Sequence, residues 1–158
     1  MADLPIKFLW ATFCKSVVTT PETGDVNING VLTGLAAEGE VQINDDGAIA
    51  KNIAIQLGSV TVVAFFQRLL ALDQHIDVGV ELEILIPTRE PQKVQRPIKI
   101  EADKDHAILN IKVEGVGYLL PNAEGSYNNV CTVRYLYEGQ ELGRAELPVR
   151  TRLSTPAS

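Results

Sequence analysis

Strict alternation of apolar and polar residues is the feature that most limits what this chain can form. Between residues 77 and 86 all the charged residues, Asp77, Glu81 and Glu83, fall on one set of alternate positions. The intervening positions are Val78, Val80, Leu82, Ile84 and Ile86. Successive side chains of a β-strand point to opposite faces, so this spacing predicts a strand with one buried and one solvated face.

The same alternation recurs in residues 94–101 and 109–113, while residues 60–66, "VTVVAFF", are apolar on both faces and predict a central strand. Turn-forming segments separate these runs at 21–25, 44–47, 87–92, 121–126 and 138–141. Only residues 65–75 show helical spacing, enough for one short helix. The spacing predicts an all-β fold: a two-sheet antiparallel β-sandwich, immunoglobulin-like or Greek-key, with about eight or nine strands.

No repeat or linker divides the 158 residues. We therefore expect a single sandwich domain over residues 1–153 and a flexible tail over 154–158. The predicted core contains the apolar residues at the inward positions of the strands. These are Ile28, Val62, Phe65, Val80, Leu82, Ile84, Leu109 and Ile111.

Charge and hydropathy exclude several classes of partner. The net charge is −6 and no segment is strongly basic, which argues against nucleic-acid binding. The basic residues of 89–99 are interleaved with Glu90 and Glu101, as on a solvated strand face. No apolar run approaches the ~18 residues needed to span a membrane, and the N-terminal segment lacks the pattern of a secretory leader. We therefore expect a cytoplasmic protein.

The chemistry-bearing residues form no catalytic motif. Cys14 and Cys131 lie in predicted strands without a Cys-x-x-Cys spacing, so buried, reduced thiols are expected. Nucleotide-binding and nucleophile-elbow motifs are also missing from the sequence. We expect no enzyme, and no catalytic, cofactor-binding or metal-binding residues are assigned.

An alternative function uses the two histidines. Asp73, His75 and Asp77 fall on one face of an extended strand, and Asp103, Asp105 and His106 lie in a turn. If the two segments met, their nitrogen and oxygen atoms would suit a divalent metal ion. The alternative is therefore a divalent-metal-dependent binder or enzyme that uses both clusters.

A second alternative is a carbohydrate-binding sandwich, which needs exposed aromatic side chains on one face. The tyrosines that offer such a platform in this sequence are Tyr118, Tyr135 and Tyr137. Tyr127 follows Gly125 as in the corner of immunoglobulin-like domains, but the antibody-type pair of cysteines does not match.

Three stretches, "KFLWATFCKSVVTTPETGDVNINGVLTGL", "SVTVVAFF" and "EGSYNNVCTVRYLYEGQELGRAELPV", resemble an uncharacterised bacterial β-sandwich domain family. The resemblance implies the sandwich fold and no catalytic residues, because the function of that family is unknown. Residues 36–58 depart from it and are expected to form an extra hairpin.

The first predicted strand suggests a role. Phe8, Trp10 and Cys14 share one face, expected to be the core face, while Leu9, Phe13 and Val17 lie on the other. An apolar second face on an edge-proximal strand is explained either by residues 36–58 folding across it as an added hairpin or by packing against a second copy. The sequence therefore favours a non-enzymatic binding or assembly module whose protein partner is unknown, with homo-oligomerisation through Leu9, Phe13 and Val17 as an expectation.

Overall fold

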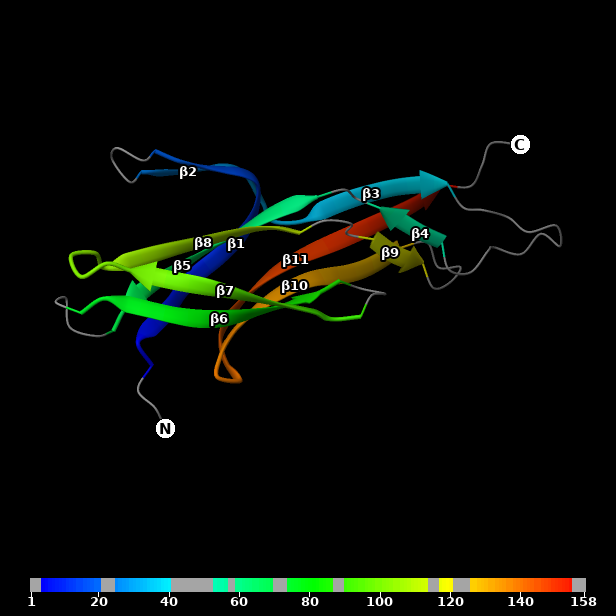
Figure 1. Cartoon of the computed structure of the whole chain (residues 1–158). Coiled ribbons are helices and arrows are strands. Elements are labelled where there is room, and N and C mark those ends of the chain that lie inside the picture. Colours follow the sequence, from blue (N-terminus) through cyan, green and yellow to red (C-terminus); the bar gives the residue numbers. More distant parts are fainter. Residues whose placement is uncertain are drawn as a thin grey trace.

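Eleven strands and no helix make up the described part of the computed structural model (Figure 1). It describes residues 4–20, 25–40, 53–56, 59–69, 74–86, 90–113, 117–120 and 126–154. The strands are β1 (Ile6–Thr19), β2 (Val26–Leu32), β3 (Leu35–Glu40), β4 (Ile53–Gln56), β5 (Val60–Arg68), β6 (Ile76–Leu85), β7 (Gln92–Ile100), β8 (His106–Val113), β9 (Gly117–Leu120), β10 (Ser126–Tyr137) and β11 (Gln140–Ser154).

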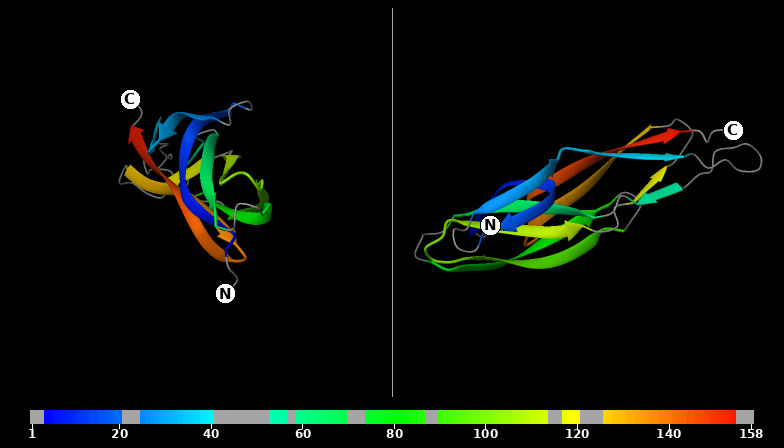
Figure 2. Two further views of the ribbon diagram at one scale, coloured as in Figure 1. Left: turned by 90° about the vertical axis from the view of Figure 1, so that its left-hand side faces the viewer. Right: turned by 90° about the horizontal axis from the view of Figure 1, so that it is seen from above.

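The strands form two main sheets. Sheet A has the order β2-β1-β5-β8, and sheet B has the order β3-β11-β10-β6-β7. Neighbouring strands are antiparallel except β3 and β11, which are parallel. A separate two-stranded sheet pairs β4 with β9. Figure 2 shows the sheets as two layers whose strands run along the long axis of the molecule.

This arrangement confirms the predicted all-β sandwich, and the two main sheets contain four and five strands. The predicted helix is not found in the described residues, since residues 65–68 continue β5 and 70–73 lie outside the description. The predicted turn at 138–141 is a two-residue hairpin. Glu138 and Gly139 both have positive φ, 48° and 82°, as a turn matched to the strand twist requires. Of the predicted hairpin over 36–58, the described residues 36–40 and 53–56 pair with β11 and β9 and not with each other. The predicted tail over 154–158 is wrong for Ser154, which lies in β11 and pairs with Glu40 of β3, and the rest of it lies outside the described residues.

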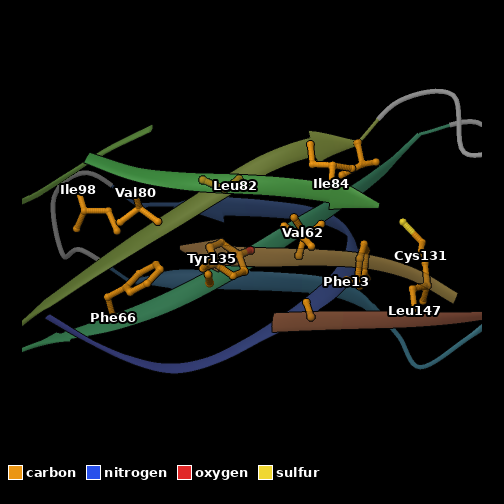
Figure 3. Close-up of a cluster of buried hydrophobic side chains, with 14 of the residues drawn as sticks. Phe13, Val62, Phe66, Val80, Leu82, Ile84, Ile98, Cys131, Tyr135 and Leu147 are labelled. Carbon is orange, nitrogen blue, oxygen red and sulfur yellow. The ribbon is translucent and has the colours of Figure 1, made fainter. Parts of the chain in front are cut away.

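The core lies between the two sheets (Figure 3). Val62, Val80, Leu82 and Ile84 are buried in it as predicted, and Leu109 and Ile111 pack against it half-buried. Three aromatic rings from both sheets, Phe8, Phe66 and Tyr135, meet with ring centroids 5.5–5.8 Å apart. Such edge-to-face and tilted pairs contribute about 0.5–1.5 kcal/mol each beyond the burial of their area.

The predicted facing of β1 is wrong beyond Phe8. Phe8 pairs with Phe66, but Trp10 pairs with Phe65, so two steps along β1 match one step along β5. This shift reverses the alternation at Leu9. As a result Phe13 is 1% exposed and belongs to the core, while Trp10 points away from it and is 45% exposed.

Phe65 is also placed differently from the prediction. It lies on the outer face of β5, half-buried, whereas Phe66 takes the core position. Residues 60–66 are apolar at both alternate sets of positions, so the sequence carries no signal for which set faces inward. Ile28 is half-buried in β2 and is not part of the core cluster.

Close packing of Phe8 on β11 gives a first prediction. A Cβ atom at Gly143 would overlap the ring of Phe8. We expect Gly143→Ala to lower the free energy of unfolding by about 1–3 kcal/mol, as overpacking a core usually does. The measurement is urea denaturation followed by circular dichroism.

Gly79→Ala is the matched control, because its added Cβ would meet only Gln95 Oε1 at 3.6 Å, an ordinary contact. This variant should stay within about 0.5 kcal/mol of the wild type. Equal stability of the two variants would contradict the packing of Phe8 against Gly143.

Candidate binding surface

The outer face of sheet A carries a row of large apolar side chains. Trp10 of β1, Phe65 of β5 and Ile108 of β8 are cross-strand neighbours in the sheet register. Leu9, the residue without a partner at the register shift, adjoins them. We call these four residues the Trp10 row. Leu9, Trp10 and Ile108 are 38%, 45% and 39% exposed, and Phe65 is half-buried.

Trp10 and Phe65 form the centre of this row. Their ring centroids are 4.2 Å apart and their planes differ by 21°, so the rings stack. Aromatic cross-strand pairs stabilise a sheet, yet the pair also presents the chain's sole tryptophan to solvent. The stack fixes two rigid rings on a regular sheet, which is the kind of preformed surface that binds a partner at low entropic cost.

Most exposed large apolar side chains lie on sheet A among those whose burial the structure describes, which leaves out residues 35–40, 126–129 and 149–154 of sheet B. The described residues include seven large apolar side chains that are exposed. They are Leu9, Trp10, Val18, Val31, Leu69, Ile108 and Val130. Only Val130 lies on sheet B, and Leu69 follows β5 directly. Single exposed apolar residues are normal, but their gathering on one sheet indicates an interaction surface.

Charge distinguishes the two sheets as well. The four strands of sheet A contain no aspartate or glutamate, although the whole chain has a net charge of −6. Lys7 and Lys112 are exposed on its outer face, on opposite sides of the Trp10 row. This face is therefore locally cationic on an acidic protein.

The outer face of sheet B is covered by compensated charges. Arg134 bonds to Glu83 at 2.7 Å and to Glu141 at 3.2 Å. Arg144 binds both carboxylate oxygens of Glu141, at 2.8 and 2.9 Å, and lowers the pKa of that carboxyl group. Lys93 lies 3.7 Å from Glu81. Such a network of exposed ion pairs is the solvated strand face that the sequence predicted.

A shallow, open hollow of about 300 Å³ lies on sheet A beyond the Trp10 row. It is found where β1 and β5 separate, since their pairing ends at Cys14 and Thr61. Its lining is Ser16, Val17, Thr61, Asn110, Ile111 and Lys112. Hydroxyl, amide and ammonium groups from three strands can donate hydrogen bonds there, which extends the polar part of this face.

The two histidine segments lie at one end of the sandwich, where a buried arginine links them. Arg68 is 7% exposed, and its guanidinium donates to backbone carbonyl oxygens of both loops. The acceptors are Lys104 (2.8 Å from Nε), Gln74, Ile100 (3.3 Å from Nη2) and Glu101. The Arg68 backbone amide also donates to Asp105 O at 2.8 Å. No pattern in the sequence indicates a cation between these loops.

The predicted metal ligands do not converge in the described residues. His75, Asp77, Asp103, Asp105 and His106 are all exposed, and Asp73 lies outside the description. Within the described residues, no three histidine, cysteine, aspartate or glutamate side chains are placed to hold a metal ion. The guanidinium of Arg68 supplies the hydrogen-bond donors for the backbone carbonyl groups at this end.

The predicted tyrosine platform is wrong for Tyr135. This residue is 0% exposed in the core, Tyr137 is half-buried, and the side chain of Tyr118 lies outside the description. The exposed aromatic pair is Trp10 with Phe65 instead. In the sequence, the only indication of this pair is that each of the two strands carries apolar residues on both of its faces. That Trp10 and Phe65 lie next to each other follows only from the register of β1 and β5.

Tyr135 gives a second prediction. Its hydroxyl is buried and has no hydrogen-bond partner among the described residues. An unsatisfied buried hydroxyl costs free energy, so Tyr135→Phe should leave the free energy of unfolding unchanged or raise it by up to about 1 kcal/mol. Urea denaturation measures this change. A loss of more than about 1 kcal/mol would show that the hydroxyl is hydrogen-bonded in solution.

Both cysteines are free and buried, as expected. Cys131 belongs to the core cluster, whereas Cys14 pairs with Thr61 on the outer side of sheet A. The two thiols therefore point to different sides of the sandwich. Burial raises the pKa of Cys131 to about 11 and also raises the pKa of Cys14.

Slow alkylation of the native protein is the third prediction. Because both pKa values are raised, little thiolate forms at pH 8, and the burial of the sulfur atoms further limits attack. Intact-mass analysis should show almost no iodoacetamide adduct on the folded protein and two adducts after denaturation without reductant. Denatured protein with no adducts would reveal a disulfide and contradict this structure.

Comparison with known proteins leaves the function open. A scan against protein-family models finds no match, and a search of curated proteins finds no sequence of significant similarity. The described residues contain no helix that could cross a lipid bilayer. The surfaces of the two sheets are therefore the basis for assigning a role.

Proposed function

We propose that this protein is a non-enzymatic assembly module that associates with a second copy of itself through the Trp10 row. The observation that carries the proposal is the exposed Trp10–Phe65 stack, extended by Leu9 and Ile108, on a sheet whose four strands contain no carboxylate. The sequence placed the interface on Leu9, Phe13 and Val17. Of these only Leu9 remains, because Phe13 is buried in the core and Val17 is half-buried.

Charge favours this face for contact between identical chains. Two copies with a net charge of −6 repel each other, and the repulsion is largest where carboxylates meet. The strands of sheet A bring no carboxylate into a face-to-face contact. The ion-paired face of sheet B would instead lose its hydration on burial, which is costly for charged groups.

The geometry suits a two-fold interface. In such an interface the same patch serves both copies, so each Trp10 row packs against its equivalent. Aromatic side chains at the centre of an interface contribute most of the binding energy, and a polar rim surrounds them. Lys7 and Lys112, on either side of the row, occupy rim positions where their ammonium groups stay hydrated.

Two further observations agree with the rest of the proposal. Within the described residues no three histidine, cysteine, aspartate or glutamate side chains are placed to hold a metal ion, and the charged side chains of Arg134, Glu141 and Arg144 are joined in an ion-pair network. Free thiols at Cys14 and Cys131 suit the reducing conditions of a cytoplasm.

The fourth prediction tests self-association. Size exclusion with light scattering should give a mass above that of the monomer at tens of micromolar. Ile108→Glu, which places a charge in the apolar row, should raise the dissociation constant by about thirtyfold or more, equivalent to about 2 kcal/mol. The matched control is Val130→Glu, which changes an equally exposed residue (41%) on sheet B and should have no effect.

Trp10 provides an independent reporter because it is the sole tryptophan. Its fluorescence emission should shift to shorter wavelength as the wild-type concentration rises, and this shift should be lost in Ile108→Glu. A monomeric wild type, or an oligomer in which Trp10 emission does not depend on concentration, would refute an interface at the Trp10 row.

A further inference from the structure

The two main sheets have four edge strands, and three of them are protected against pairing with another chain. Edge strand β7 contains Pro97 and three cationic residues, Lys93, Arg96 and Lys99. Edge strand β3 contains Glu38 and Glu40. Edge strand β8 contains Lys112 and lies beside β7 (Figure 1). Charges, proline and coverage are the usual means by which proteins prevent edge-to-edge association.

Strand β2 has none of these three protections, although its Gly30 has a positive φ of 64° that interrupts the extended backbone. Its seven residues, "VNINGVL", include no charged residue and no proline, and it forms the border of sheet A next to β1. In the described part of the chain no strand pairs with its outer side. Figure 1 shows β2 at the margin of the molecule. Its backbone amide and carbonyl groups on that side are a template for one more strand.

The two faces of β2 differ in burial, and an added strand could continue this difference. Val26, Ile28 and Leu32 are half-buried, and Leu32 packs against the core. Asn27 and Val31 are exposed on the opposite face. A partner strand with the same alternation would extend the apolar layer on one side and the exposed layer on the other.

We propose that β2 pairs antiparallel with β2 of a second copy, so that two copies of sheet A form one continuous sheet. β2 is itself a strand with the required alternation. The register that pairs all seven residues is centred on Asn29, which then lies opposite its own equivalent. In this register Val26 faces Leu32, Ile28 faces Gly30, and Asn27 faces Val31. Directly opposed residues of antiparallel strands lie on the same face of the sheet, so Val26, Ile28 and Leu32 of both copies lie on the half-buried face.

Electrostatics permits this pairing despite the acidic charge of each copy. β2 itself has no charged residue, and Lys15 of β1, whose side chain packs over Gly30, is a cation that each copy brings close to the ribbon. The nearest carboxylates, Asp25 of each copy, flank opposite ends of the paired strands. At about 3.4 Å per residue they are about 27 Å apart, several times the Debye length of about 8 Å at physiological ionic strength.

This interface is separate from the Trp10 row. The pairing of β2 with β1 begins at Phe13 and Leu32 and runs toward Thr19, away from Trp10. A strand added beyond β2 therefore leaves Trp10 exposed. The inference stands without the proposed function, and the two interfaces together would allow each chain to contact two others.

The test uses two double variants with charges at Asn27 and Val31, both exposed in β2. Asn27→Lys with Val31→Lys places two like-charge pairs opposite each other in the proposed register. Asn27→Glu with Val31→Lys places two opposite-charge pairs there. Both are made in the Ile108→Glu background, which removes association through the Trp10 row, and each is checked for an unchanged fold by circular dichroism.

Light scattering should show that the Ile108→Glu parent and its Glu/Lys derivative dimerise. The Lys/Lys derivative should have a dissociation constant at least about tenfold higher than the Glu/Lys derivative. Backbone amides of β2 should exchange more slowly with deuterium as the parent is concentrated. A monomeric parent, or equal dissociation constants for the two derivatives, would overturn the pairing of β2.

The two proposals fail in different ways. If only the Trp10 row mediates association, the Ile108→Glu parent is monomeric while wild-type Trp10 emission still shifts with concentration. If only β2 mediates it, the parent is a dimer and Trp10 emission is constant. Each result supports one proposal and overturns the other.

Discussion

The one-residue register shift in β1 decides how the rest of this molecule is arranged. Before the shift Phe8 enters the core, where it meets Phe66, Tyr135 and the backbone of Gly143. After it Phe13 occupies the core and Trp10 stacks on Phe65 outside. A regular strand would place Phe8 and Trp10 on one face and expel Phe13. The shift thus lets a single strand provide aromatic residues both to the core and to the surface.

The two sheets meet water in different chemical ways. Sheet B exposes arginines and glutamates that neutralise one another, a surface that is well hydrated and gains little from contact. Sheet A exposes stacked rings, aliphatic side chains, hydroxyls and lysines without carboxylates. Association through sheet A, as we propose, would remove apolar area from water without burying a carboxylate of its strands.

The prediction of a metal site from the two histidine segments depends on Arg68, which lies outside both segments. The loops that carry His75 and Asp103–His106 do meet, but their backbone carbonyl oxygens face a guanidinium group. Its planar array of donors satisfies carbonyls from both loops, while the histidine and carboxylate side chains remain in solvent. In the described residues, Arg68 therefore holds the two loops together at this end of the sandwich.

The amino-acid sequence alone predicts the all-β sandwich, the turn at 138–141, the solvated face of β6 and the burial of Val62, Val80 and Leu82. Each of these follows from short-range periodicity or turn chemistry. It did not determine which face of β1 or β5 is inside, because both faces are apolar and the register shift has no marker in the sequence. Three features depend on residues far apart in the chain: the Trp10–Phe65 stack, the hydrogen bonds of Arg68 to the two loops, and the position of β2 at the edge of sheet A. Only the tertiary pairing of strands decides such contacts, since side-chain period alone does not specify which strands become neighbours.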